Sequence, residues 1–228
     1  MPAYNAGNYI YDAIESIQRQ TYQNWELCIV DDGSEDCTYA MAMACANEDE
    51  RIRVKSIQHA GCPTARNACL KMMRGAIYAR QDADDTCSPV RLERQVDFLI
   101  NNPDHELVTC RYNWLKGGIT IPQRAEGMSP KQYLVNKGGR PVNATIVTWS
   151  QVYEAAGPFI ARQLAGSDGD WNFRVLQVGF RWGYIPEYLY TQRRHAGQIS
   201  QRLRGQQAKT HEEALREYGK LGNTTRRK

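Results

Sequence analysis

The sequence lacks the features by which several classes of protein are recognised. No apolar run approaches the ~20 residues that a helix needs to cross a bilayer. No charged segment followed by an apolar one opens the chain, so we expect no signal peptide. The seven cysteines are scattered and none forms Cys-x-x-Cys, which argues against a zinc site and favours the reduced thiols of a cytosolic protein.

The composition is that of an ordinary globular protein. Of the 228 residues, 42% are hydrophobic and 24% are charged, which is enough for one large domain with a core, or for a domain and a subdomain. The formal net charge of +4 permits anionic ligands but is too small to indicate nucleic acid as a partner.

Strand and helix patterns alternate over roughly the first 110 residues. The strand patterns lie at 25–30, 52–57, 76–79 and 107–112. The helix patterns lie at about 9–19, 34–46, 63–73 and 88–100. This alternation predicts an α/β fold with a parallel sheet and helices on both faces. Residues 1–5 have the pattern of a strand running into a loop, and we expect that part of a first strand is missing before them.

The second half of the chain is less regular. Expected elements there are a strand at 144–149, a helix at 171–178, short extended pieces at 184–186 and 188–191, and a charged helix at 206–220. We therefore divide the chain into a nucleotide-binding βα half at 1–111, a second half of the same domain at 112–205, and a C-terminal helix with a basic tail at 206–228.

Polar clusters follow three of the expected strands. They are Tyr4-Asn5, Asp31-Asp32 and the acidic run Asp82 to Asp85. Ligands of open α/β sheets bind at the carboxyl ends of the strands, where these clusters should meet. Unpaired carboxylates so close together repel one another and need water or a cation, and Mg²⁺ or Mn²⁺ prefers such oxygen ligands. The alternative is a solvated acidic turn, but the convergence of the three clusters favours a nucleotide site.

An ordered set of short motifs carries a family resemblance. The motifs are Pro2-x-Tyr4-Asn5, Gln20-Thr21, Trp25-Glu26, Val30 to Ser34, Ala65-Arg66-Asn67, Asp82 to Asp85, Pro89-x-Arg91-Leu92, Asp168, Arg174, Ile185-Pro186-Glu187 and Arg194-His195. The chain resembles the inverting glycosyltransferases of family 2, which have the A-type nucleotide-sugar fold. Two departures stand out: Ser167 replaces the usual Glu before Asp168, and the Gln-x-x-Arg-Trp signature of processive membrane synthases is absent.

The resemblance implies roles for the acidic residues. Asp84 would be the direct ligand of Mn²⁺ or Mg²⁺, Asp82 would contact metal or ribose, and Asp85 would orient the loop. Asp168 would be the general base that takes the acceptor proton, with Asp170 as the rival carboxylate and a helix N-cap as the alternative for either. His195 matches a position that is a metal ligand in some members, the alternative being a surface histidine.

The resemblance also implies a nucleotide-sugar site. Its expected residues are Pro2, Tyr4, Asn5, Asp32, Arg66, Asp82 and Ala83. Tyr4 would stack on the nucleobase and Asp32 would accept a base N–H; the alternatives are a half-buried aromatic and a loop acid. Arg66 would contact the diphosphate or the base, because guanidinium suits phosphate geometry, or would form a structural ion pair to the acidic cluster.

These features predict a Rossmann-like glycosyltransferase A-type fold, with a mostly parallel central sheet flanked by helices and a C-terminal acceptor-side region. The expected enzyme is a metal-dependent inverting glycosyltransferase that uses a nucleotide sugar, with a UDP-sugar favoured, and a glycan or glycolipid acceptor. We expect it in the cytoplasm, in contact with the inner face of the membrane at most. Two alternatives stay open: a non-catalytic nucleotide-sugar-binding module, and a haloacid-dehalogenase-like phosphatase, suggested by Asp82-x-Asp84-x-Thr86.

Overall fold

The computed structural model describes residues 1–123, 143–160 and 167–199, together with five single residues between 203 and 216. The predicted C-terminal helix and basic tail at 206–228 therefore lie almost entirely outside the described residues. Among the helices that the structure describes, none combines the length and the apolar character that crossing a membrane requires.

The first three βα repeats form a parallel sheet. Its strands, in spatial order, are β1 (Pro2–Ala3), β2 (Leu27–Asp31) and β3 (Ile52–Ser56). The helices that follow them are α1 (Ile10–Gln18), α2 (Thr38–Glu48) and α3 (Cys62–Met72). The apolar spacing that predicted the first helix is confirmed, because Ile10, Ala13, Ile14 and Ile17 are all buried. Pro2 and Ala3 pair with β2, so these residues are themselves a short first strand.

The second sheet is mixed. It contains β4 (Ile77–Ala79), β5 (Thr86–Cys87), β6 (Leu107–Lys116), β7 (Ile119–Gln123), β8 (Val147–Trp149) and β9 (Trp182–Arg193). Its order is β4-β8-β6-β9-β5, with β7 on β6. Among the strands that the structure describes in this sheet, only the β6–β9 pair is parallel, and the other pairs run antiparallel.

The mixed pairing corrects one detail of the expectation, which was a mostly parallel central sheet. Parallel pairing holds for β1, β2 and β3, where helices carry the chain back between strands. β6 and β7 are instead joined by Gly117 and Gly118, both with positive φ (56° and 81°), and such a tight turn can only return the chain antiparallel. Residues 184–186 and 188–191, expected as separate pieces, belong to the single strand β9.

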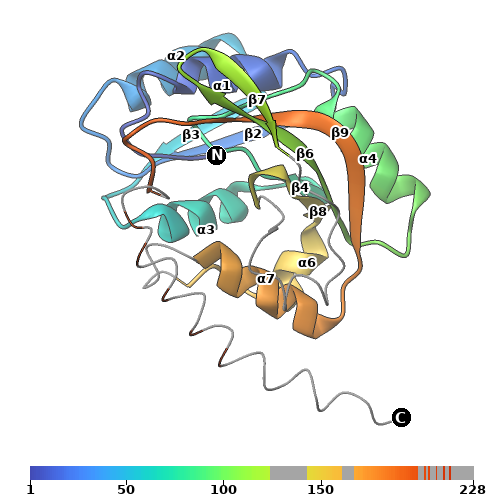
Figure 1. The fold of residues 1–228 in the computed structure, drawn as a ribbon. Helices are drawn as coiled ribbons and strands as arrows, with labels where there is room; N and C mark the ends of the chain where they lie inside the picture. The colour runs from blue at the N-terminus through green and yellow to red at the C-terminus, as the bar shows by residue number, and fades with distance from the viewer. Residues whose placement is uncertain are drawn as a thin grey trace, which may run out of the picture.

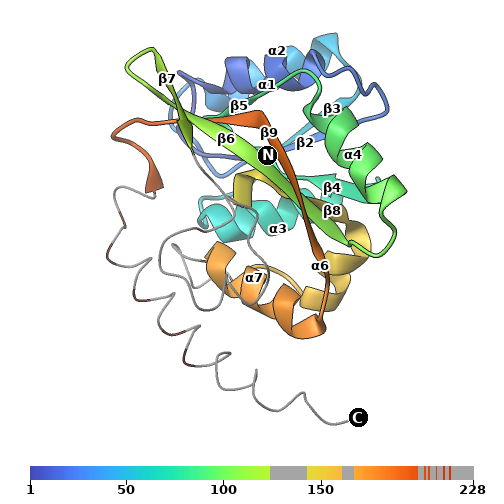
Figure 2. The ribbon, with the colours of Figure 1, turned by 45° about the vertical axis from the view of Figure 1, so that its right-hand side comes forward.

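Helices cover both faces of the strands. α1 and α2 lie together on one side, and α3, α6 (Ser150–Ala156) and α7 (Ser167–Val178) lie on the other (Figure 1). The same layers are visible in the rotated view, where α4 (Arg91–Asn101) packs beside β6 and β9 (Figure 2). The expected strand at 144–149 divides into a 3-10 turn, Asn143–Thr145, and β8.

A small apolar cluster of Val30, Ala65 and Cys69 packs α3 on β2, and two larger apolar cores fix the layers. The larger one joins α1, β2 and the second sheet through residues such as Ile14, Ile29 and Val108. The other is aromatic and joins α6 to α7: Tyr153 and Trp171 stack with ring centroids 4.5 Å apart, and Phe159 lies 5.6 Å from Trp171. α7 carries Asp168 and packs on this aromatic core, which also includes Tyr78 of β4. This packing fixes the position of Asp168 beside β4.

Candidate active site

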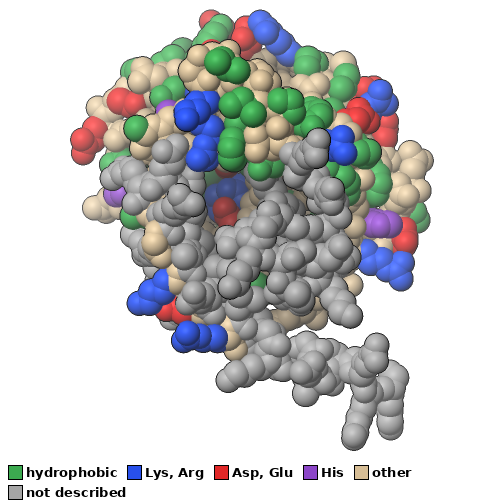
Figure 3. Space-filling model, in the orientation of Figure 1, with side chains coloured by type: hydrophobic (Ala, Val, Ile, Leu, Met, Phe, Trp, Pro, Cys, Tyr) green, Lys and Arg blue, Asp and Glu red, His purple; other side chains and the backbone are tan. Residues whose placement is uncertain are grey.

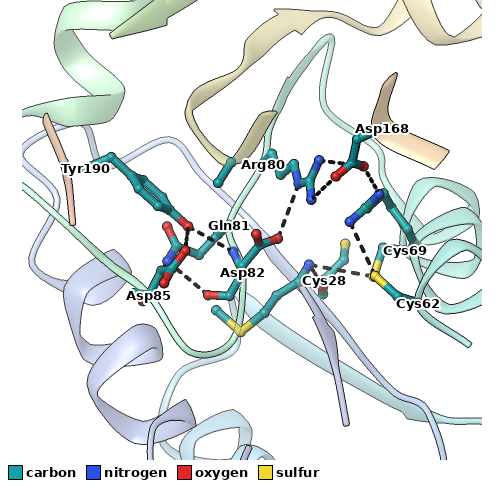
Figure 4. Close-up of polar contacts among 12 residues, drawn as sticks. Cys28, Cys62, Cys69, Arg80, Gln81, Asp82, Asp85, Asp168 and Tyr190 are labelled. Carbon is teal, nitrogen blue, oxygen red and sulfur yellow. Dashed lines mark hydrogen bonds and ion pairs between the residues drawn. The ribbon is translucent and has the colours of Figure 1, made fainter. Parts of the chain in front are cut away.

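The acidic run forms the loop between β4 and β5, and its shape is set by Asp85. This side chain is 1% exposed and its carboxylate accepts hydrogen bonds from Tyr190 Oη and the Arg193 backbone N–H, each at 2.9 Å (Figure 4). Burial, and then the neighbouring Asp84 and Asp82, raise the pKa of Asp85 well above its ordinary value. Asp85 thus ties the loop to β9, which is the orienting role expected of it.

A buried arginine, Arg91, stabilises the same loop. Arg91, fully buried at the start of α4, donates to Gln81 Oε1 at 3.1 Å and to the Arg80 carbonyl at 2.8 Å. Gln81 in turn donates to the Asp85 carbonyl at 2.8 Å. Arg91 of the Pro-x-Arg-Leu motif at 89–92 is therefore structural: it satisfies the Arg80 carbonyl and holds Gln81, which satisfies the Asp85 carbonyl, and leaving such buried groups without partners would be costly.

The structure brings together the two predicted metal ligands. His195 Nε2 lies 3.0 Å from Asp84 Oδ2, and the His195 ring packs against Tyr9 at 4.4 Å. Arg193 fixes this segment by donating to the Asp84 carbonyl at 3.2 Å and to Asp12 at 2.8 Å. Burial, and then Asp82, raise the pKa of Asp84.

Asp84 and His195 together fit a divalent cation whose remaining ligands would be substrate oxygens. Within the part of the chain that the structure describes, no group of three or more His, Cys, Asp or Glu could hold a metal alone. Mg²⁺ is usually bound through one or two carboxylates plus substrate phosphates and water, and imidazole also suits Mn²⁺. One carboxylate and one imidazole therefore match a metal shared with a phosphate ligand better than a structural metal.

Asp168 lies in the first turn of α7, between two arginines. Arg66 Nη1 donates to Asp168 Oδ1, while Arg80 contacts both oxygens, at 2.9 and 3.2 Å. Burial alone raises the pKa of Asp168, but Arg66 and Arg80 outweigh it and lower the pKa to about 2. Figure 3 shows acidic and basic side chains at the base of a hollow on this face of the molecule.

The structure separates the two carboxylates that competed for the role of base. The Asp168 side chain is 33% exposed, whereas that of Asp170 is 2% exposed and pairs with Arg174 at 2.9 Å. Arg174 also donates to the Pro158 carbonyl, so the pair locks α7 to the loop before it. The helix begins at Ser167 rather than at Trp171, which places both carboxylates inside its first turn. Of the two carboxylates, Asp168 is therefore the more accessible to solvent.

The predicted nucleobase end lies at the carboxyl ends of β1 and β2. Tyr4 is 40% exposed and stacks on the His59 ring at 4.2 Å. Asp32 is 2% exposed, and its two oxygens accept the N–H groups of Ala60 and Gly61, each at 2.9 Å. These contacts are those of the alternative, a loop-shaping acid, and recognition of a base by Asp32 stays a prediction.

The other predicted nucleotide-site residues shape this edge of the sheet. Asn5 has a left-handed backbone (φ 48°) and bonds through its own N–H to Ser34 Oγ at 3.0 Å. Pro2 pairs with Val30 in the sheet, and Ala83 is buried in the acidic loop. Arg66 does form an ion pair, but with Asp168 rather than with the acidic loop.

Arg80 is the site residue that the sequence analysis did not single out. Its Nε lies 3.2 Å from Asp82 Oδ1, while its other nitrogens hold Asp168, so one guanidinium joins the acidic loop to α7 (Figure 4). The available signal was a charged residue just after the apolar strand Ile77–Ala79 and just before the carboxylates. Arg80 is only 5% exposed, and a charge buried this deeply requires partners.

Comparison with solved structures defines the class of fold. The structure of S. aureus TarS residues 1–349 in complex with UDP-GlcNAc matches with a TM-score of 0.73 at 18% identity, over 86% of this chain and 58% of that one. A further structure of S. aureus TarS matches with a TM-score of 0.71 at 16% identity, over 99% of this chain and 43% of that one. The predicted A-type glycosyltransferase fold is confirmed.

The sequence comparisons then give the family. The model of glycosyl transferase family 2 matches residues 1–151, and the chain belongs to that family. The putative glycosyltransferase EpsE of Bacillus subtilis (strain 168) is 29% identical over 211 residues, which cover 89% of this chain and 74% of EpsE. The Escherichia coli glucosyltransferase WfgD, named for UDP-Glc and a GlcNAc-diphosphoundecaprenol acceptor, is 38% identical over 131 residues, half of its length. The chain spans 40% of the Bacillus subtilis protein TuaG.

Membership of this family sets aside the phosphatase alternative. In haloacid-dehalogenase-like enzymes the Asp-x-Asp-x-Thr motif closes the first strand. Here Asp82 follows β4, after three strands of the parallel sheet.

Proposed function

We propose that this protein is a metal-dependent inverting glycosyltransferase that transfers a sugar from a UDP-sugar to a glycan or glycolipid. The observation that carries the proposal is the Arg80 guanidinium, which contacts Asp82 at 3.2 Å and Asp168 at 2.9 Å. It sets the acidic loop, where the donor diphosphate would lie, beside Asp168, the more exposed of the two carboxylates on α7. Family 2 membership and the UDP-Glc and UDP-GlcNAc in the names of WfgD and of the TarS complex support the donor class.

Each group has a distinct part in this proposal. Asp168 accepts the proton of the acceptor hydroxyl as the new bond forms on the face of the sugar opposite the diphosphate, which inverts the anomeric centre. Asp84 and His195 would hold the cation, with Asp82 toward the ribose or the metal. When bound, the cation would stabilise the charge of the leaving diphosphate as a Lewis acid.

The decisive experiment measures nucleotide binding and turnover together. We expect UDP to raise the melting temperature in Mn²⁺ or Mg²⁺ more than in chelator, because a ligand that binds only the native state stabilises it. A UDP-sugar should also be hydrolysed slowly, and the liberated UDP measured. Metal-dependent UDP binding with no hydrolysis and no transfer to any offered acceptor would instead support a non-catalytic binding module. No binding of any nucleoside diphosphate would contradict the proposal.

The nucleobase end has its own test. Tyr4→Ala should weaken all nucleotides similarly, since stacking is possible with any base. Asp32→Ala should weaken UDP more than CDP if Asp32 accepts the N3–H of uracil, by about 1–3 kcal/mol, the cost of an unpaired buried polar group. Calorimetric titration of both nucleotides decides the matter. Equal losses would assign Asp32 to the loop contacts with Ala60 and Gly61 alone.

A further inference from the structure

The two arginines that hold Asp168 are bonded very differently. Arg80 directs three nitrogens at carboxylates: Nε at Asp82, and Nη1 and Nη2 at the two oxygens of Asp168. Its backbone is equally constrained, because its N–H donates to the Ile146 carbonyl at 3.0 Å and its carbonyl accepts from Arg91 at 2.8 Å. Both the guanidinium and the backbone of Arg80 are therefore held in place.

Arg66 is only partly satisfied by hydrogen bonds, although its guanidinium carbon also lies 4.6 Å from the centroid of the Phe159 ring. Its Nη1 donates to Asp168, but its Nη2 is 3.3 Å from the Cys62 sulfur, a weak acceptor. Its Nε is buried and has no hydrogen-bond partner among the residues that the structure describes. The Arg66 side chain is 3% exposed and lies close enough to Arg80 for the two positive charges to repel. A buried guanidinium in this state is suited to a second anion.

We propose that Arg66 is the exchangeable partner of Asp168 and Arg80 the fixed one: the diphosphate of a bound nucleotide sugar draws the Arg66 guanidinium away, leaving Asp168 held by Arg80 alone. This inference rests on the proposed function, because the anion is the donor of the same reaction. No bond is made or broken; one ion pair replaces another. Arg80 is then a positioning residue, and Asp168 becomes a stronger base only when the donor is in place.

The consequence is a base that is weak until the donor binds. Two opposite charges hold the pKa of Asp168 at about 2, and removing one of them raises the pKa toward its ordinary value. The titratable and charged groups around Asp168 and its two arginines come from five elements. They are Arg66 and Cys62 from α3, Tyr78 from β4, Arg80 and Asp82 from the loop after β4, Tyr153 from α6, and Asp170 on the same helix as Asp168. Burial keeps the tyrosines and Cys62 neutral, and Asp170 is neutralised by Arg174. Asp82 keeps its contact with Arg80 in both states.

The test follows the Asp168 carboxyl carbon by NMR in ¹³C-aspartate-labelled protein, with Mg²⁺ in every sample. The signal is assigned by its loss in Asp168→Asn. We expect saturating UDP to raise the pKa of Asp168 by about 1 or more, and uridine, which lacks the diphosphate, to leave it unchanged. Arg66→Gln should weaken UDP binding and raise the pKa before UDP is added, and UDP should then produce no further rise.

Arg80→Gln is the matched control. It also raises the pKa of Asp168 in the absence of UDP, but Arg66 remains, so UDP should raise the pKa further. If UDP raised the pKa of Asp168 equally in wild type and in Arg66→Gln, the phosphate charge would be acting through space. That result would overturn the exchange. Tight UDP binding with an unchanged Asp168 pKa would overturn the exchange alone. Failure of UDP to bind wild type, measured by calorimetry, would overturn both this inference and the proposed donor.

Discussion

The protein has two acidic regions at one edge of its sheets, and they differ in how their charge is balanced. On α7, Asp168 pairs with Arg66 and Arg80, and Asp170 pairs with Arg174. In the loop after β4, Asp84 contacts His195, and Asp85 is buried against Tyr190 and a backbone N–H. The α7 carboxylates are neutralised by guanidinium groups, whereas Asp84 and Asp85 lie in a region with excess negative charge.

The direction of the pKa shifts follows from this difference. Arg66 and Arg80 lower the pKa of Asp168, while burial and mutual repulsion raise the pKa values of Asp84 and Asp85. Among the described residues, the carboxylates of Asp84 and Asp85 pair with no guanidinium, whereas both α7 carboxylates do. In the proposed mechanism these chemically identical side chains have different partners: a cation at the loop, and an acceptor hydroxyl at Asp168.

The largest effect expected within this comparison is on stability. Asp170→Asn removes the charge that balances Arg174 in a pair whose side chains are 2% and 17% exposed. We expect a loss of about 3 kcal/mol in the free energy of unfolding, the lower end for breaking a buried ion pair. Urea unfolding measures it. A folded, stable and inactive Asp170→Asn protein would mean that Asp170 is the base.

The next effect is on turnover. Asp168→Asn should lower the rate of sugar transfer by roughly 10²-fold or more, because an amide cannot accept the acceptor proton. UDP affinity should not fall, since Arg66 remains available to the diphosphate. Steady-state rates and calorimetric titration of the same preparation measure the two properties. A variant that keeps wild-type turnover would exclude Asp168 as the base.

Local patterns were sufficient to predict much of the fold. The spacing of Ile10, Ala13, Ile14 and Ile17 predicted α1 because the period of an amphipathic helix is a property of adjacent turns. The acidic loop was predicted to follow a strand because its carboxylates come just after the apolar run at 76–79, which is also a local pattern. The mixed pairing of the second sheet could not be predicted in this way, because β4 pairs with β8 some 70 residues later in the chain.

The candidate site was predictable as a set of residues but not as a set of contacts. Asp84 and His195 were predicted to share a metal, and they lie 3.0 Å apart. The partner of Arg66 was not predicted, since Arg66 and Asp168 are 102 positions apart and meet only because α3 and α7 lie on the same face. Arg80 was overlooked because its strand-end position alone does not say which carboxylate it will meet. Such choices depend on tertiary packing, which no local pattern encodes.

The third prediction concerns the cation expected at the loop. Asp84→Asn removes one of two candidate ligands, so the increase in UDP affinity that Mn²⁺ produces should shrink by about tenfold or more, at least the cost of losing a second-shell partner. Titrations in Mn²⁺ and in chelator measure it. The matched variant on α7, Asp168→Asn, should keep the full metal effect. An unchanged metal effect in Asp84→Asn would assign the loop carboxylates to a role without metal.

The smallest effect is a difference in pH dependence, measured in chelator. The pKa of Asp85 is raised in the folded protein, first by burial and then by Asp84 and Asp82. The folded state therefore binds more protons than the unfolded state above pH 3.8, and the contribution of Asp85 to stability is present below that pH and lost as the pH rises. Asp85→Asn cannot lose a proton, so its free energy of unfolding relative to wild type should increase from pH 4 to pH 7, by at most about 1.4 kcal/mol per pH unit.

Asp168 is the control for that slope, because its pKa is shifted in the opposite direction. With a folded pKa of about 2, Asp168 is ionised in both states above roughly pH 5, and its stabilising contribution is lost only as the pH falls from 3.8 toward 2. Asp168→Asn should therefore parallel wild type between pH 5 and 7, where Asp85→Asn diverges. Urea unfolding of the three proteins across this range measures both slopes. If Asp85→Asn ran parallel to wild type and Asp168→Asn diverged, the assignment of excess charge to the loop and balanced charge to the helix would be reversed.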